Sequence, residues 1–144
     1  MLAVCLLALN SCKKSSTNPQ TATNLSLKFN GTAYSYPSAT ASYNASQNAI
    51  QIIGNLNNAD VIYVVIPQNL KVGTFDIASG GAAVTFSTST TNDQDSYIAT
   101  SGSVVITSFT SSTIAGTFQA TCSSLANVAG TVTEGKFQLK YTSQ

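Results

Sequence analysis

Apolar and polar residues alternate along most of the chain from residue 25 onward. The last such segment is the clearest, because Phe137, Leu139 and Tyr141 alternate with polar neighbours. A period of two residues is typical of a β-strand with one buried and one solvated face. The pattern predicts strands over residues 25–29, 50–56, 73–77, 83–88, 97–100, 103–109, 114–122 and 137–141.

Residues 61–66 are apolar at every position, so both faces of this segment are hydrophobic. Such a run predicts a central strand, which ends at Pro67. Turn-forming pairs separate the segments, among them Asn30-Gly31, Ser101-Gly102 and Glu134-Gly135. Short strands between closely spaced turns predict an all-β domain over residues 25–144. We expect an antiparallel β-sandwich or a small open barrel of about 8–10 short strands.

The first residues are typical of an export signal. Residues 1–9 are an apolar run too short to span a bilayer, and Leu9-Asn10-Ser11-Cys12 follows. An apolar residue three positions before a cysteine and a small residue just before it resemble a bacterial lipobox. The resemblance implies a cleaved signal peptide over residues 1–11 and a lipidated Cys12, and the polar composition that follows predicts a flexible tether over residues 12–24. The alternative is an ordinary cysteine after a hydrophobic start.

Composition narrows the range of functions. The chain has 144 residues, of which 43% are hydrophobic and 8% are charged, with a net charge of +1 and no histidine, arginine or tryptophan. Histidine-based catalysis and histidine metal ligands are therefore excluded, and no cationic cluster indicates a nucleic-acid partner. We expect that the protein is not an enzyme, because a hydrolase without histidine would need two carboxylates that converge on the substrate.

One polar loop offers oxygen ligands for a cation. Asn92, Asp93, Asp95 and Ser96 lie close together in the sequence, and carboxylate and amide oxygens suit Ca²⁺. The alternative is a solvated loop, because the spacing is not that of an EF-hand. No other cofactor is expected. Cys122 falls on the inward face of its predicted strand, which indicates a buried thiol rather than a nucleophile.

Three tyrosines follow the first predicted turn. Tyr34, Tyr36 and Tyr43 lie in a stretch with few aliphatic residues, and exposed rings there would stack on the faces of sugars. The alternative is that Tyr34 and Tyr36 cover one end of the sandwich with their hydroxyls in water. The tyrosines are the candidate ligand-stacking residues.

The order of motifs resembles a known family. An Asn30-Gly31 hairpin precedes an Ile50-to-Gly54 strand and a Gly73-Thr74-Phe75 motif, and Gly116-Thr117-Phe118 and Gly135-Lys136-Phe137 follow. Over residues 26–142, this order resembles uncharacterised Bacteroidetes-type lipoproteins with one domain of unknown function after a Ser-Cys-Lys-Lys lipobox. The resemblance implies an all-β domain in the cell envelope and supplies no activity or catalytic residue.

These expectations combine into one hypothesis. We expect a protein anchored in the outer membrane through acylated Cys12, which acts as a non-catalytic binding or structural module. The resemblance implies outer-membrane transport, because Lys13 follows the cysteine. It also favours a periplasm-facing orientation, since the tether lacks the acidic run that similar surface-exported lipoproteins often carry. The alternatives are a glycan-binding module using exposed tyrosines, or a subunit of an envelope complex. A complex subunit requires an exposed apolar patch or a free strand edge.

Overall fold

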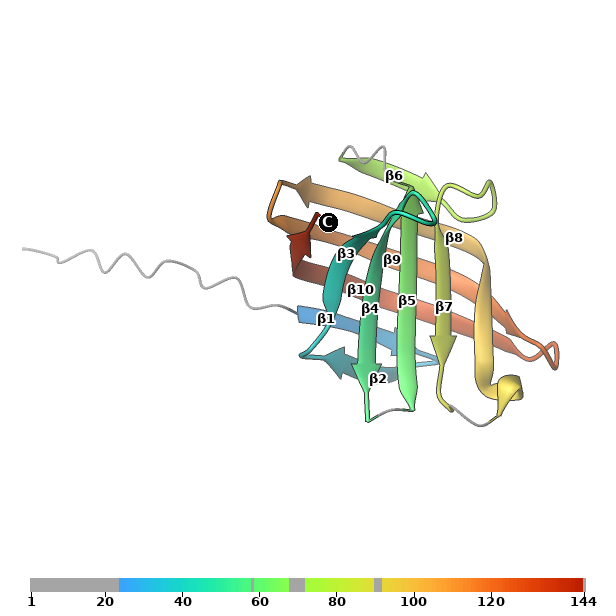
Figure 1. Cartoon of the computed structure of the whole chain (residues 1–144). Helices are drawn as coiled ribbons and strands as arrows, with labels where there is room; N and C mark the ends of the chain where they lie inside the picture. Colours follow the sequence, from blue (N-terminus) through green and yellow to red (C-terminus); the bar gives the residue numbers. More distant parts are fainter. Residues whose placement is uncertain (1–23, 58, 68–71, 90–91, 144) are drawn as a thin grey trace, which may run out of the picture.

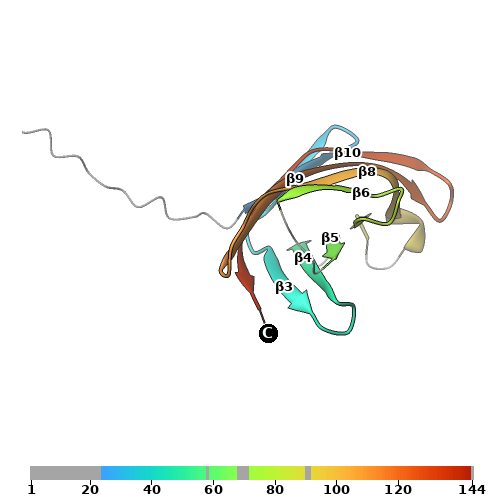
Figure 2. The same cartoon turned by 90° about the horizontal axis from the view of Figure 1, so that it is seen from above.

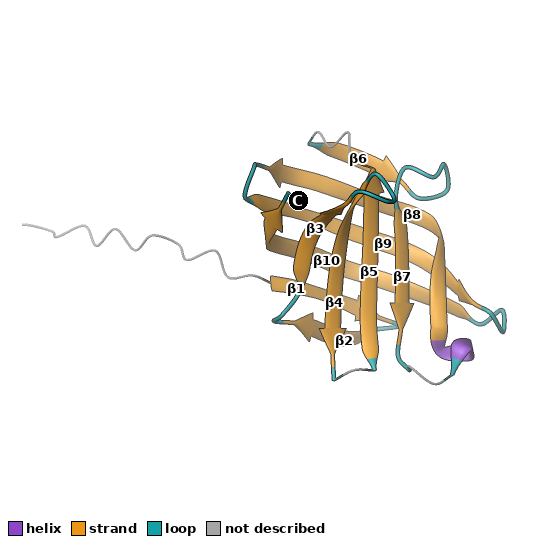
Figure 3. Ribbon diagram, in the orientation of Figure 1, coloured by secondary structure: helices purple, strands orange, loops and turns teal. Residues whose placement is uncertain are grey.

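The computed structural model describes residues 24–57, 59–67, 72–89 and 92–143. These residues form ten β-strands and one short 3-10 turn, η1, and no α-helix (Figures 1 and 3). The elements are β1 (Asn24–Phe29), β2 (Thr32–Tyr36), β3 (Thr40–Asn44), β4 (Ala49–Leu56), β5 (Asp60–Pro67), β6 (Gly73–Asp76), β7 (Ala83–Ser87), η1 (Asp93–Asp95), β8 (Ser96–Phe109), β9 (Thr113–Ser124) and β10 (Ala129–Thr142). The predicted all-β class is confirmed.

Seven of the strands close into a barrel, in the order β3-β4-β5-β7-β8-β9-β10 and back to β3 (Figure 2). A short parallel pairing closes the ring, with Tyr141 opposite Ala41 and Thr142 opposite Ser42. The other pairings are antiparallel. The β1–β2 hairpin lies along β10, and β6 lies along β8. The chain is therefore a closed seven-stranded barrel with additional strands, and not clearly a sandwich.

Two predicted turns are instead bulges within long strands. Ser101-Gly102 lies inside β8, where the pairing with β9 shifts between Ala99 and Ser101, and Gly102 has a φ of 124°. Glu134-Gly135 lies inside β10, where the register also shifts and Glu134 has a φ of 52°. A bulge inserts one extra residue and bends the strand without ending it. Both strands are consequently 14 residues long rather than short.

The Asn30-Gly31 hairpin turn is confirmed, with φ angles of 47° and 84° at its two residues. Positive φ at both positions is typical of the tight turn that matches the twist of paired strands. The turn places β2 antiparallel to β1, with Phe29 opposite Thr32.

One side of each barrel strand is buried in a single interior cluster. In β5, Ile62, Val64 and Ile66 point inward and are fully buried. Aromatic rings fill one end of the interior, where the ring centroid of Phe29 lies 4.4 Å from that of Phe86. Small barrels are filled by side chains in this way.

The predicted signal segment 1–11 and residues 12–23 of the predicted tether, Cys12 included, lie outside the described residues. Asn24, at the end of that predicted tether, is the first residue of β1. Within the part of the chain that the structure describes, no helix is long and apolar enough to cross a bilayer.

Candidate functional site

The three candidate tyrosines do not form one exposed surface. The ring of Tyr36 is completely buried, so it is not available to stack on a ligand. Tyr34 is half-buried and packs edge-on against Phe86, with ring centroids 5.1 Å apart. Tyr43 is half-buried on β3, where its hydroxyl donates a hydrogen bond to Asn48 Oδ1 at 2.9 Å. The expectation of exposed rings is wrong for Tyr36, because alternation along β2 turns this side chain inward.

Tyr36 occupies an unusual site for a polar group. Its hydroxyl is buried, and no described residue gives it a hydrogen-bond partner. Burial raises the pKa of this hydroxyl, and the nearby charges of Asp60 and Tyr34 raise it further. The ring packs where Gly54 leaves room, since a Cβ on Gly54 would lie 2.8 Å from Tyr36 Cγ. The residue is therefore part of the core.

The candidate Ca²⁺ loop uses its oxygens for local hydrogen bonds. Asn92 Oδ1 accepts the Gln94 N–H at 3.1 Å, and Asn92 Nδ2 donates to Asp95 Oδ2 at 3.1 Å. The Ser96 hydroxyl lies 3.2 Å from that of Ser87. The side chain of Asp93 lies outside the described part, and elsewhere in that part no three metal-binding side chains of the His, Cys, Asp or Glu type come together. Calcium binding by this loop stays a prediction.

The remaining reactive groups are separated or buried. Asp60 begins β5, and the carboxylate of Asp76 at the end of β6 accepts the Ser79 N–H at 2.7 Å. Cys122 is 1% exposed, and burial raises the pKa of its thiol from 9.0 to about 11. A buried thiol that holds its proton is a poor nucleophile.

The outer side of β5 is hydrophobic as well as its inner side. Val61, Tyr63 and Val65 alternate with the buried residues and point away from the barrel, with Tyr63 43% exposed. The central position predicted for this strand is confirmed, because β5 pairs with β4 on one side and β7 on the other. Strands with two apolar faces are usually covered on both. Here no described element covers the outer one (Figures 1 and 2).

Neighbouring strands extend this hydrophobic surface. Ile53 of β4 lies opposite Tyr63, Tyr63 lies opposite Thr85 of β7, and Thr85 lies opposite Ile98 of β8, which is 53% exposed. Ala83 lies beside Val65 in the next row. We call this surface the outer apolar face. It comprises Ile53, Val61, Tyr63, Val65, Ala83 and Ile98, and none of these residues or of their cross-strand partners on β4, β5 and β7 carries a charge.

Sequence reasoning missed Tyr63 as a candidate contact residue. Its signal is present in the segment 61–66, where the odd positions are as hydrophobic as the even ones. The alternation establishes that one set faces inward. It does not show whether another element covers the second set, and this depends on how the whole chain closes.

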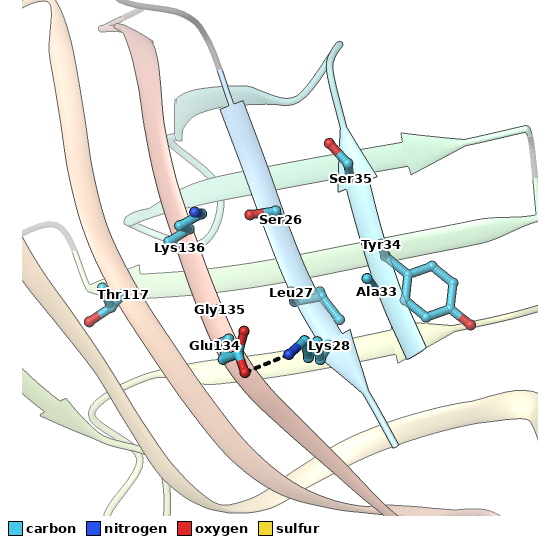
Figure 4. Close-up of a pocket in the computed structure, with 10 residues that line it drawn as sticks. All are labelled: Ser26, Leu27, Lys28, Ala33, Tyr34, Ser35, Thr117, Glu134, Gly135 and Lys136. Carbon is cyan, nitrogen blue, oxygen red and sulfur yellow. Dashed lines mark hydrogen bonds and ion pairs between the residues drawn. The ribbon is translucent and has the colours of Figure 1, made fainter. Parts of the chain in front are cut away.

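The opposite wall of the barrel is polar and carries an open depression of about 500 Å³ (Figure 4). Ser26, Lys28, Thr117, Glu134 and Lys136 are among the residues that line it. Lys28 Nζ forms an ion pair with Glu134 Oε1 at 2.7 Å, across β1 and β10. The two walls thus differ in charge, because ammonium and carboxylate groups line the depression whereas the outer apolar face carries no charged side chain.

Comparison of the chain with known protein families and with curated proteins finds no match, and comparison with solved structures finds none either. The resemblance to envelope lipoproteins therefore stays a prediction that rests on the motifs themselves.

Proposed function

We propose that the protein is a lipid-anchored contact module of the cell envelope, without catalytic activity, which binds a partner protein through the outer apolar face. Acylation of Cys12 would hold it in the outer membrane, with the barrel in the periplasm. The observation that carries the proposal is the uncovered second face of β5, extended by Ile53 and Ile98 on either side.

An exposed apolar surface of this kind is the feature that a complex subunit needs. Contiguous hydrophobic side chains on a surface indicate a site of association. Tyr63 is well suited to the centre of such a site, since a tyrosine ring buries a large area and loses little conformational freedom. The matching partner surface would be apolar and uncharged, because a charge placed against this face would be desolvated without a counter-ion.

The distribution of reactive groups supports a non-catalytic role. The Cys122 thiol is buried, and the acids with described side chains, Asp60, Asp76, Asp95 and Glu134, belong to four different elements. Glu134 is paired with Lys28. Acid–base hydrolysis requires two carboxylates that converge on one reacting atom, and the placement of these acids on separate elements favours a role without it.

The anchor is tested by fractionation. Cys12→Ala is expected to move the full-length protein from the membrane fraction to the soluble fraction, because acyl chains supply the binding energy. An unchanged distribution would refute the lipoprotein assignment.

The contact surface is tested by a pair of matched variants. Tyr63→Asp places a charge at the centre of the outer apolar face, and Thr74→Asp adds the same charge at an exposed position on β6. After crosslinking in intact membranes, a partner that copurifies with the wild type is expected to be lost with Tyr63→Asp and kept with Thr74→Asp. Equal recovery with both variants would contradict a role for this face.

A glycan-binding module is the second proposal, and Tyr63 supports it better than the three tyrosines chosen from the sequence. A ring exposed on a flat strand surface can stack on a sugar. Sugar platforms are stronger with several coplanar rings, and Tyr63 is the one aromatic residue among those of the outer apolar face. The protein-contact proposal is therefore preferred.

A further inference from the structure

The described lysines gather on one wall of the barrel. Lys28 lies on β1, and Lys136 and Lys140 lie on β10. These strands are neighbours, and the lysines alternate with buried residues, so all three side chains point out of the barrel from adjoining parts of its surface, with Lys140 next to the seam where Tyr141 pairs with Ala41. We call it the lysine face. Lys136 and Lys140 lie on the same side of β10, about 13 Å apart along the strand.

This surface carries a net positive charge. Glu134 neutralises Lys28, with which it forms the 2.7 Å ion pair, but Lys136 and Lys140 have no carboxylate partner among the described residues. Glu134 is the one acid of the described part that lies on β1, β9 or β10. The face therefore has a net charge of about +2 on a protein whose total is +1.

The chain enters the barrel at this same surface. Asn24, the first residue of β1, pairs with Gln138, which lies between Lys136 and Lys140 on β10. The predicted tether joins Cys12 to Asn24 through a dozen residues, for which a random coil has an r.m.s. reach of roughly 20 Å. On a tether of that length, Asn24 would often come within about 8 Å of the bilayer surface, the distance over which charges interact at physiological salt.

We propose that the lysine face rests on an anionic lipid surface and thereby turns the outer apolar face away from the membrane. The inference rests on the lipid anchor proposed above and adds the orientation of the anchored domain. β4 and β5 form the wall opposite β9 and β10 (Figures 1 and 2). An orientation that places the lysine face on the lipid therefore also points the outer apolar face away from the membrane. Each lysine near an anionic bilayer favours this orientation about fivefold over one that faces away, so the two unpaired lysines favour it roughly 25-fold.

The depression on this wall provides donors for lipid phosphate. The side chains of Ser26, Lys136 and Thr117 line it from β1, β10 and β9 (Figure 4). Ammonium and hydroxyl groups donate hydrogen bonds to phosphate oxygens, and those from an ammonium are the stronger. The outer apolar face has hydroxyl and amide neighbours such as Thr85 and Asn55 but no ammonium group, so it would bind an anionic surface less strongly than the lysine face.

The test holds the full chain on lipid nanodiscs by an N-terminal His tag and a nickel-chelating lipid, which bypasses acylation. The discs contain either phosphatidylcholine alone or equal parts of phosphatidylcholine and phosphatidylglycerol. A gadolinium lipid, with a diamagnetic lutetium control, broadens the amide resonances of residues near the bilayer. On anionic discs we expect several-fold greater relaxation for β1 and β10 than for β4 and β5, and no such difference on neutral discs.

Two charge-matched double variants make the test specific. Lys136→Gln with Lys140→Gln removes two positive charges from the lysine face, and is expected to abolish the difference between the walls. Thr40→Glu with Asn55→Asp lowers the net charge equally at exposed positions of β3 and β4, and is expected to preserve it. Equal relaxation of both walls on anionic discs would overturn the proposal, as would a difference that survives loss of the two lysines. Because the tag replaces the acyl chains, such a failure is distinct from a failure of the Cys12→Ala fractionation.

Discussion

Removing the hydroxyl of Tyr36 is expected to stabilise the barrel, because the substitution deletes a polar group from a residue with no exposed surface. The hydroxyl is buried and has no partner among the described residues. Its removal from water on folding is therefore not compensated by a hydrogen bond. Such an unsatisfied group costs about 1–3 kcal/mol. Tyr36→Phe retains the ring and its packing beside Gly54, so most of that cost is recovered.

We expect a gain of about 1 kcal/mol in the free energy of unfolding, at the lower end of this range because loss of the oxygen leaves a small void. For a domain of this size the gain corresponds to a rise of roughly 3–5 °C in Tm. Urea unfolding of the full chain at neutral pH measures it, with the denaturant slope unchanged.

Tyr43→Phe is the matched control. It removes the same atom from a half-buried tyrosine whose hydroxyl donates to Asn48 at 2.9 Å. Loss of that hydrogen bond is expected to lower stability by about 0.5–1 kcal/mol, so the two variants should differ in sign. A loss of 1 kcal/mol or more in Tyr36→Phe would refute the reasoning, because it would mean that the hydroxyl is hydrogen-bonded in the folded protein.

Two further stability predictions follow from the geometry of particular residues. Gly102→Ala should destabilise the barrel by about 3 kcal/mol, since φ is 124° and the new Cβ would lie 2.2 Å from a backbone oxygen of β9, whereas Gly80→Ala, with a φ of 78° and open space, should cost about 1 kcal/mol. Equal losses in thermal unfolding would show that the β8 bulge is not closely packed. Cys122→Ala should reduce the loss of stability between pH 9 and pH 11. The buried thiol keeps its proton up to a pKa of about 11 while the unfolded thiol ionises near 9.0, so folding is increasingly disfavoured as pH rises through this interval. The difference in urea stability between wild type and variant should change by about 1–2 kcal/mol over that range, and an unchanged difference would contradict a buried thiol.

Local patterns predict much of this fold because they depend on neighbouring residues. Alternation identifies the inward residues of β9 and β10, and the Asn30-Gly31 pair identifies the first hairpin. The same local signals mislead at Gly102 and Gly135, because a glycine that ends a strand and a glycine that bulges within one look alike in a sequence. The difference is decided by the register of pairing with β9, the strand that follows β8 and precedes β10.

The candidate surfaces depend on closure of the barrel, which local patterns do not encode. The tyrosine cluster is dispersed because alternation turns Tyr36 inward, while Tyr34 packs against Phe86 and Tyr43 lies on a separate strand. The outer apolar face is assembled from four strands, and each contributes one to three residues that are unremarkable alone. Tyr63 becomes part of a larger hydrophobic surface through Ile53 and Ile98, which lie on neighbouring strands only after folding.

The most direct test of the proposed contact module is site-specific photocrosslinking in living cells. A photoreactive amino acid replaces Tyr63 in the outer apolar face or, as a control, Thr74 on β6. We expect a discrete crosslinked product of one reproducible mass at position 63 and none at position 74. Absence of a product at position 63, or the same product from both positions, would contradict the claim that this face binds a partner.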